Sequence, residues 1–142
     1  MQRAVGRVAF LGSDCPELPL ADMHAALAHS ADPRGVCSIC PASDGGYTLL
    51  ALPDGADEAA CFDGVKWSSD DTCLSQLAAL SRAGLLCTIG RTHADVDELD
   101  DLKALAQRLL ARPEAAAGGK ESRDGECGAG CPRTAKLLGE VL

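Results

Sequence analysis

The chain alternates between short, continuous apolar runs and longer segments in which apolar residues recur every three or four positions. The apolar runs at 8–11, 36–41, 48–52 and 85–89 predict strands. The first run is apolar throughout, which is typical of a strand buried on both faces of a parallel sheet. Helical spacing over 18–29, 68–83 and 97–112 predicts helices packed against that sheet. The alternation predicts an α/β fold with three layers, α/β/α, and a mostly parallel sheet.

The first strand ends abruptly in Gly12-Ser13-Asp14-Cys15-Pro16. A parallel strand that leads into a helix delivers its last residues to the carboxyl edge of the sheet, where open α/β folds bind ligands. Gly12 allows a ligand to approach the backbone closely, and Pro16 stiffens the turn that holds the Asp14 carboxylate. We therefore expect Asp14 to contact a metal or a ligand. The alternative is a turn aspartate that hydrogen-bonds its own backbone.

Two further acidic turns follow predicted strands. The turn Asp44-Gly45-Gly46-Tyr47 is equally well explained as a ligand-binding loop or as a hairpin turn. Asp95 and Asp97 come after the strand at 85–89. Asp97 is also explained as the N-cap of the next helix, which leaves Asp95 as the freer carboxylate. His93, beside Asp95, is the one histidine that merits a test as a site residue.

The ends of the second helix carry local signals. Ser68 and Asp71, three residues apart, predict a capping box at its start, and Gly84 predicts its end. The polar residues 53–63 predict a loop. Aromatic residues make up only 3% of the chain, so we expect Trp67 to pack in the core.

Length and charge restrict the class of protein. A chain of 142 residues is the size of one domain, expected here at 1–112 and followed by a flexible linker at 113–130 and a short C-terminal helix at 131–142. The net charge of −8 argues against nucleic-acid binding, because that affinity comes mainly from Lys and Arg. No apolar run approaches the roughly 20 residues that span a bilayer, and no signal-peptide pattern precedes the first strand. We expect a cytoplasmic protein without membrane contact.

Eight cysteines could form disulfides or a zinc site. The pairs Cys37–Cys40 and Cys127–Cys131 together offer four thiolate ligands. However, residues three apart on a strand point to opposite faces, so Cys37 and Cys40 could not share a metal ion. We expect reduced thiols, and keep zinc as the alternative.

The order of these motifs resembles a known family. Gly12-Ser13-Asp14-Cys15-Pro16 is followed by Asp44-Gly45-Gly46-Tyr47, then by Trp67-Ser68, and then by Asp95-Val96-Asp97. This order is similar to that of the radical-SAM/selenodomain-associated transferase 1 family, over residues 7–110. That family belongs to the nucleotide-diphospho-sugar transferases, so the resemblance implies a partial glycosyltransferase-A-like (GT-A-like) fold.

The resemblance also implies roles for the motif residues. Asp14, with Asp95 and Asp97, would bind a divalent cation, Mg²⁺ or Mn²⁺, that holds a nucleotide diphosphate. The loop that carries Gly12 and Ser13 would approach the same ligand. The resemblance places Asp44, Gly45, Gly46 and Tyr47 on the sugar or acceptor side. It gives Trp67 and Ser68 a structural or substrate-lining role.

Two functional hypotheses follow. The first is a metal-dependent glycosyltransferase or nucleotidyltransferase that acts on a nucleotide-diphospho-sugar. However, members of the superfamily have a further strand and a Gly-rich basic loop before the strand at 8–11, and only seven residues precede it here. The second hypothesis is therefore a catalytically inactive remnant that serves as an interaction or regulatory module. In either case a homo-oligomer or a complementing chain is an expected partner.

Overall fold

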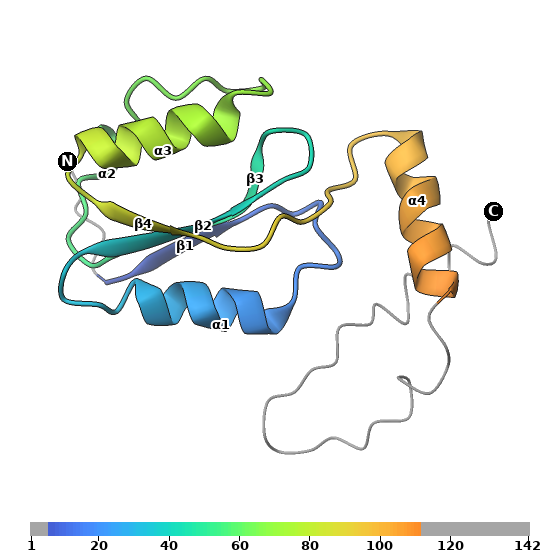
Figure 1. Cartoon of the computed structure of the whole chain (residues 1–142), viewed down its shortest axis with the longest axis horizontal. Coiled ribbons are helices and arrows are strands. Elements are labelled where there is room, and N and C mark those ends of the chain that lie inside the picture. The colour runs from blue at the N-terminus through green and yellow to red at the C-terminus, as the bar shows by residue number, and fades with distance from the viewer. Residues whose placement is uncertain (1–5, 112–142) are drawn as a thin grey trace, which may run out of the picture.

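A computed structural model of the chain describes residues 6–111. Four strands and four helices follow one another in that range: β1 (Val8–Leu11), α1 (Leu20–His29), β2 (Val36–Pro41), β3 (Tyr47–Leu52), α2 (Glu58–Phe62), α3 (Thr72–Arg82), β4 (Leu86–Ile89) and α4 (Leu99–Leu110). Helix α1 covers one face of the sheet, α2 and α3 cover the other, and α4 lies beyond the strand ends (Figure 1). The predicted α/β fold with three layers is confirmed.

The sheet is mixed, so the prediction of a mostly parallel sheet is wrong. Its strand order is β1-β3-β2-β4. β3 runs antiparallel to both of its neighbours, β1 and β2, and the parallel pair of neighbours is β2 and β4. The short turn between β2 and β3 forces the antiparallel pairing, whereas α2 and α3 provide the crossover that a parallel β2–β4 pair needs. An apolar run carries no information on strand direction.

β1 lies at one edge of the sheet, and the prediction that it is buried on both faces is also wrong. Phe10 is 39% exposed and Leu11 is 52% exposed. β1 pairs with β3, with Phe10 opposite Leu50 in the register. Among residues 6–111, no strand pairs with the other edge of β1, and its apolar side chains are exposed.

The core is split between the two faces of the sheet. Ile39 and Leu50 point toward α2 and α3, where they pack with Leu80. Leu49 and Ala51 point to the opposite face and pack against α1. This alternation follows from the two-residue period of a strand. Both central strands are thus covered on both faces.

The same alternation separates the two cysteines of β2. Cys37 belongs to the core under α2 and α3, and Cys40 belongs to the core under α1. The six cysteines that the structure describes are free thiols. The prediction that Cys37 and Cys40 cannot share a metal ion is confirmed.

The helices on the α3 side differ from the sequence prediction at two points. Part of the predicted loop 53–63 is helix α2, whose N-terminus is capped by the Asp57 carboxylate, which accepts hydrogen bonds from the backbone of Ala59 and Ala60. Helix α3 starts at Thr72 rather than near Ser68, because Ser68 has a left-handed backbone conformation with φ 52°. The predicted end of α3 is confirmed, since Gly84 has φ 77°.

The N-cap of helix α4 lies one residue after the predicted cap, Asp97. Glu98 is the N-cap, and its backbone N–H donates a hydrogen bond to the Asp101 carboxylate at 2.9 Å. Asp97 is therefore not the cap, and its carboxylate is available for other contacts. Leu99, expected in the buried stripe, is exposed, whereas Leu105 and Leu109 are buried.

Some predictions lie outside the described residues. These are the linker at 113–130, the C-terminal helix at 131–142 and the Cys127–Cys131 pair. Within residues 6–111, none of the helices has the length and apolar character needed to cross a membrane.

Candidate functional site

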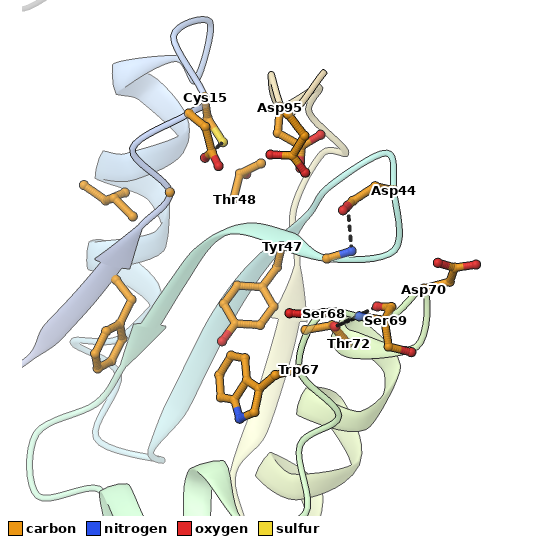
Figure 2. A pocket seen from close by; sticks show the side chains of 16 residues that line it. Cys15, Asp44, Tyr47, Thr48, Trp67, Ser68, Ser69, Asp70, Thr72 and Asp95 are labelled. Carbon is orange, nitrogen blue, oxygen red and sulfur yellow. Dashed lines mark hydrogen bonds between the residues drawn. The ribbon is translucent and has the colours of Figure 1, made fainter. Parts of the chain in front are cut away.

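A cavity of about 600 Å³ opens at one end of the sheet. Four segments surround it: the end of β1 with the loop after it, the β2–β3 turn with the start of β3, the residues from 67 to the start of α3, and the loop between β4 and α4 (Figure 2). β1, β2 and β4 all run in one direction and β3 runs in the opposite direction. The carboxyl ends of β1, β2 and β4 therefore meet at this end of the sheet. The edge of the sheet that the sequence predicts for a site therefore has a cavity, although the sheet is mixed.

Most of the predicted site residues line this cavity. They are Gly12, Asp14, Asp44, Gly46, Tyr47, Trp67, Ser68, Asp95 and Asp97. Ser13 and Gly45 do not line it. The lining residues that the sequence argument missed are Phe10, Leu11, Cys15, Thr48, Ser69, Asp70 and Thr72. Each lies within four positions of a predicted residue in the chain, so extending each motif by up to four positions would have found them.

Three carboxylates gather on one wall of the cavity. Asp44, Asp95 and Asp97 each place a carboxylate oxygen within 4.8 Å of the others. The sequence predicts Asp14, Asp95 and Asp97 as the metal ligands, but the cluster contains Asp44 in place of Asp14. Burial raises the pKa of Asp95, and the negative charges of Asp44, Asp97 and Asp14 raise it further. The wall thus concentrates negative charge that no cationic side chain lining the cavity offsets.

Backbone hydrogen bonds hold the loops of the site together. The N–H of Val96 donates to the carbonyl oxygen of Asp14 at 3.1 Å, and the N–H of His93 donates to that of Pro41 at 2.9 Å. The N–H of Ser43 in turn donates to the carbonyl oxygen of His93 at 3.0 Å. These bonds join the β4–α4 loop to both the β1 loop and the end of β2, which brings Asp95 to Asp44.

The turn that carries Asp44 fits both interpretations of its sequence. It connects the antiparallel strands β2 and β3, as a hairpin turn does, and it also lines the cavity. The Asp44 carboxylate accepts a hydrogen bond from the N–H of Gly46 at 2.8 Å. That bond fixes the side chain toward the loop opposite, where Asp95 lies (Figure 2).

His93 lies behind the acidic wall and does not line the cavity. Its Nε2 is 2.8 Å from one oxygen of the Asp22 carboxylate on α1, and the Arg91 guanidinium is 2.7 Å from the other oxygen. The hydrogen bond from Arg91 is the largest cause that lowers the pKa of Asp22. This cluster fastens the β4–α4 loop to α1. The expectation that His93 contacts a ligand has no support from its position.

The turn after β1 is tightly packed around Gly12. A side-chain carbon at Gly12 would lie 2.8 Å from the Asp14 carboxylate and 3.0 Å from the Cys15 sulfur. Cys15 lines the cavity, but burial and the hydrogen bond from its thiol to Asp14 raise its pKa to about 12. Cys15 is therefore a protonated thiol at neutral pH and a poor nucleophile.

An aromatic wall faces the other part of the cavity. Trp67 lines it and is 59% exposed, so the prediction that Trp67 packs in the core is wrong. The ring of Phe62 lies 6.1 Å from that of Trp67, and Phe10 meets Phe62 edge-on at 5.4 Å. Tyr47 lies between Trp67 and the acidic wall (Figure 2), and its hydroxyl donates to Gln76. Burial raises the pKa of Tyr47 to about 12, so that hydroxyl stays protonated at neutral pH.

Comparisons with known proteins place this geometry in context. A family described as uncharacterized proteins conserved in bacteria (DUF2064) matches residues 1–69. A crystal structure from Desulfovibrio desulfuricans G20, of a protein provisionally assigned as a nucleotide-diphospho-sugar transferase, matches 96% of this chain with 26% identity and a TM-score of 0.70. No curated protein matches the chain. The chain covers only 52% of the Desulfovibrio chain, about half its length.

Proposed function

We propose that this chain is part of a transferase that acts on a nucleotide-diphospho-sugar and depends on a divalent cation. The observation that carries the proposal is the cluster of Asp44, Asp95 and Asp97 in a cavity at the carboxyl strand edge. The likeness to the Desulfovibrio structure supports the general reaction class. The motif order supports the narrower assignment to the radical-SAM/selenodomain-associated transferases. The group transferred is a glycosyl or a nucleotidyl group.

The donor set fits a hard divalent cation. Carboxylate oxygens are the ligands that Mg²⁺ and Mn²⁺ prefer, and Asp44, Asp95 and Asp97 converge without a basic side chain among the lining residues. A bound cation would neutralise the repulsion that raises the pKa of Asp95. In such a site the ion supplies positive charge that stabilises a leaving diphosphate. Asp14 approaches the cluster from the β1 loop and adds negative charge to it.

The protein's own residues would hold and orient the substrate. The two loops that carry Asp14 and Asp95 are joined by backbone bonds, so their carboxylates are positioned before a ligand binds. Gly12 leaves the turn without a side chain, which lets a ligand approach the backbone. The protonated thiol of Cys15 and the buried hydroxyl of Tyr47 are unsuited to nucleophilic attack. We therefore expect direct transfer to an acceptor, without a covalent intermediate on these groups.

Calorimetry with the intact chain tests this function. We expect one or more nucleotide-diphospho-sugars to bind in the presence of Mn²⁺ or Mg²⁺, and binding to be at least about tenfold weaker in EDTA. A panel that varies the base and the sugar separately identifies the substrate. Asp54→Asn removes a carboxylate that does not line the cavity, so as a control variant it should bind the same ligands as the wild type. Absence of binding under all these conditions, with no other chain that restores it, contradicts the proposal.

One observation favours a second candidate, a non-catalytic module that assembles through its sheet. Within the part of the chain that the structure describes, one edge of β1 pairs with no strand, and the side chains of Phe10 and Leu11 are exposed. Such an edge is a template for pairing with another strand. We propose that a second copy of this chain pairs there when the chain has no catalytic role.

Light scattering tests the second candidate. We expect the chain to have the molar mass of a dimer or larger assembly, and Leu11→Lys to reduce it to that of one chain, because a charged edge opposes strand pairing. Leu74→Lys is the control, since Leu74 is 67% exposed on α3, away from β1. A monomeric wild-type chain at high micromolar concentration contradicts this candidate.

A further inference from the structure

The aromatic residues of this chain are concentrated at the cavity. The sequence contains one tryptophan, one tyrosine and two phenylalanines. Three of the four, Phe10, Tyr47 and Trp67, line the cavity, and the fourth, Phe62, contacts both Phe10 and Trp67. Aromatic side chains usually dominate core packing because they bury large areas. Here the core is built mainly from Leu, Ile, Ala and Cys, and Tyr47 and Phe62 pack against it as partly buried side chains. Phe10 and Trp67 are exposed, so core packing does not explain their position.

Trp67 is held in place although it is exposed. Phe62 lies beside its ring at 6.1 Å with an interplanar angle of 31°, and Phe10 supports Phe62 edge-on. The backbone next to Trp67 is also fixed, because the Thr72 hydroxyl donates to the carbonyl oxygen of Lys66 at 2.7 Å and accepts from the N–H of Ser69 at 3.2 Å. An exposed indole with 59% of its surface free, on a supported loop, is a preformed stacking surface.

Acidic side chains of the cavity restrict what can stack there. Two carboxylates outside the proposed cation cluster, those of Asp14 and Asp70, line the cavity, and when ionised they can only accept hydrogen bonds. A ligand that spans the cavity must therefore present an apolar ring face to Trp67 and several donors to the carboxylates. A pyranose ring has both, because its C–H groups form an apolar face and its hydroxyl groups donate. A nucleobase has a stacking face but few donors, and a free phosphate has neither.

We infer that Trp67, supported by Phe62 and Phe10, is a stacking platform for the sugar ring of the substrate. This inference rests on the proposed function for the identity of the whole substrate. It adds a subsite that recognises the sugar separately from the diphosphate and the base. Tyr47 lies between the platform and the acidic wall (Figure 2), so the substrate would pass over Tyr47 between its sugar at Trp67 and its diphosphate at the cation.

The single tryptophan gives a direct measurement. Trp67 is the only indole in the chain, so its emission reports on this subsite alone. We expect free monosaccharides and sugar 1-phosphates to change the emission in a saturable way in metal-free buffer with EDTA, with the change specific to some sugars. Nucleoside monophosphates at the same concentrations should leave the emission unchanged. Because this arm contains neither nucleotide-sugar nor metal, it can succeed when the calorimetric test of the proposed function fails.

Substitutions separate stacking from general damage to the fold. Saturation-transfer NMR of the bound sugar should show that Trp67→Ala weakens binding about tenfold or more, while Trp67→Phe keeps it within about threefold, because a smaller ring still stacks. Leu74→Ala removes an equally exposed apolar side chain from α3 and should leave sugar binding unchanged. Thermal unfolding of each variant shows whether it is folded.

Three results would overturn the inference. One is emission that responds to nucleoside monophosphates and not to sugars, which would make the platform a base subsite. Another is equal sugar binding by Trp67→Ala and the wild type. The third is emission that shifts to shorter wavelength with protein concentration and without ligand, which would mean that a second copy of the chain covers Trp67.

Discussion

Replacing Gly45 with alanine is expected to lower the free energy of unfolding by about 4 kcal/mol, which corresponds to a fall in Tm of about 15 °C. Gly45 has φ 94°, where an alanine costs about 1–2 kcal/mol. A side-chain carbon there would also lie 2.6 Å from the carbonyl carbon of Asp70 and still closer to its oxygen. Both partners are backbone, so the turn and the loop before α3 would have to separate.

A second glycine isolates the contribution of this contact. Gly55 has φ 73° and no neighbour within 4 Å of the position of an added carbon. Gly55→Ala should therefore show only the conformational cost of about 1–2 kcal/mol. Thermal and urea unfolding of both variants give the comparison. Equal losses would mean that Gly45 and Asp70 are not packed together in solution.

Gly45→Ala should also disturb the site although Gly45 does not line the cavity. The carbonyl oxygen of Gly45 accepts a hydrogen bond from the N–H of Cys73 in the first turn of α3 at 2.8 Å. Moving this turn therefore displaces Asp44 and the start of α3 together. We expect weaker ligand binding in the folded fraction of the Gly45→Ala protein, whereas Gly55→Ala should bind normally.

Asp95→Asn is expected to stabilise the metal-free protein at neutral pH while it removes stabilisation by Mn²⁺. The folded pKa of Asp95 is raised above its unfolded value by burial and by three carboxylates. Between those two pKa values the folded state binds more protons than the unfolded state, so stability falls as pH rises through that window. Above both pKa values the cost of the ionised carboxylate is fully present, and a neutral amide removes this cost.

Differential scanning calorimetry with and without Mn²⁺ at pH 5 and pH 7 tests both the stabilisation of the metal-free protein and the loss of stabilisation by Mn²⁺. In the wild type we expect Mn²⁺ to raise Tm at pH 7, because a ligand that binds only the folded state stabilises it. In Asp95→Asn this increase should be small, and the Tm without metal should be higher than in the wild type. Asp100→Asn, an exposed carboxylate on α4, should retain the full metal response. A lower metal-free Tm for Asp95→Asn at pH 7 would contradict the electrostatic argument.

Most of the predicted site residues line one cavity, and the sequence could predict this grouping because its signals are local. Glycine and aspartate at the ends of apolar runs mark strand ends, and strand ends of neighbouring strands meet at one edge. The same argument could not choose between Asp14 and Asp44 as a partner of Asp95. That choice depends on the hydrogen bond from Gly46 to Asp44 and on backbone bonds between distant loops, which leave no trace in composition or spacing.

Strand direction and side-chain exposure were the main errors, and they have a common cause. The run at 8–11 is apolar because Phe10 and Leu11 line the cavity and the sheet edge, not because both faces are covered. Trp67 was placed in the core for the same reason, since hydrophobic character alone does not distinguish a packed side chain from a binding surface. The cap at Asp97 failed because Glu98 and Asp101 form a better reciprocal pair one residue later.

The loops of the site are joined mainly through main-chain atoms. The bonds Val96–Asp14, Gly12–Thr48 and Gly45–Cys73 each connect two lining segments through N–H and carbonyl groups. Bonds of this kind do not depend on which side chains the same residues carry. Selection could therefore replace the side chains that face the ligand one at a time without breaking the main-chain bonds that join the loops. An ancestral cavity of this design can diverge toward new ligands at little cost in folding.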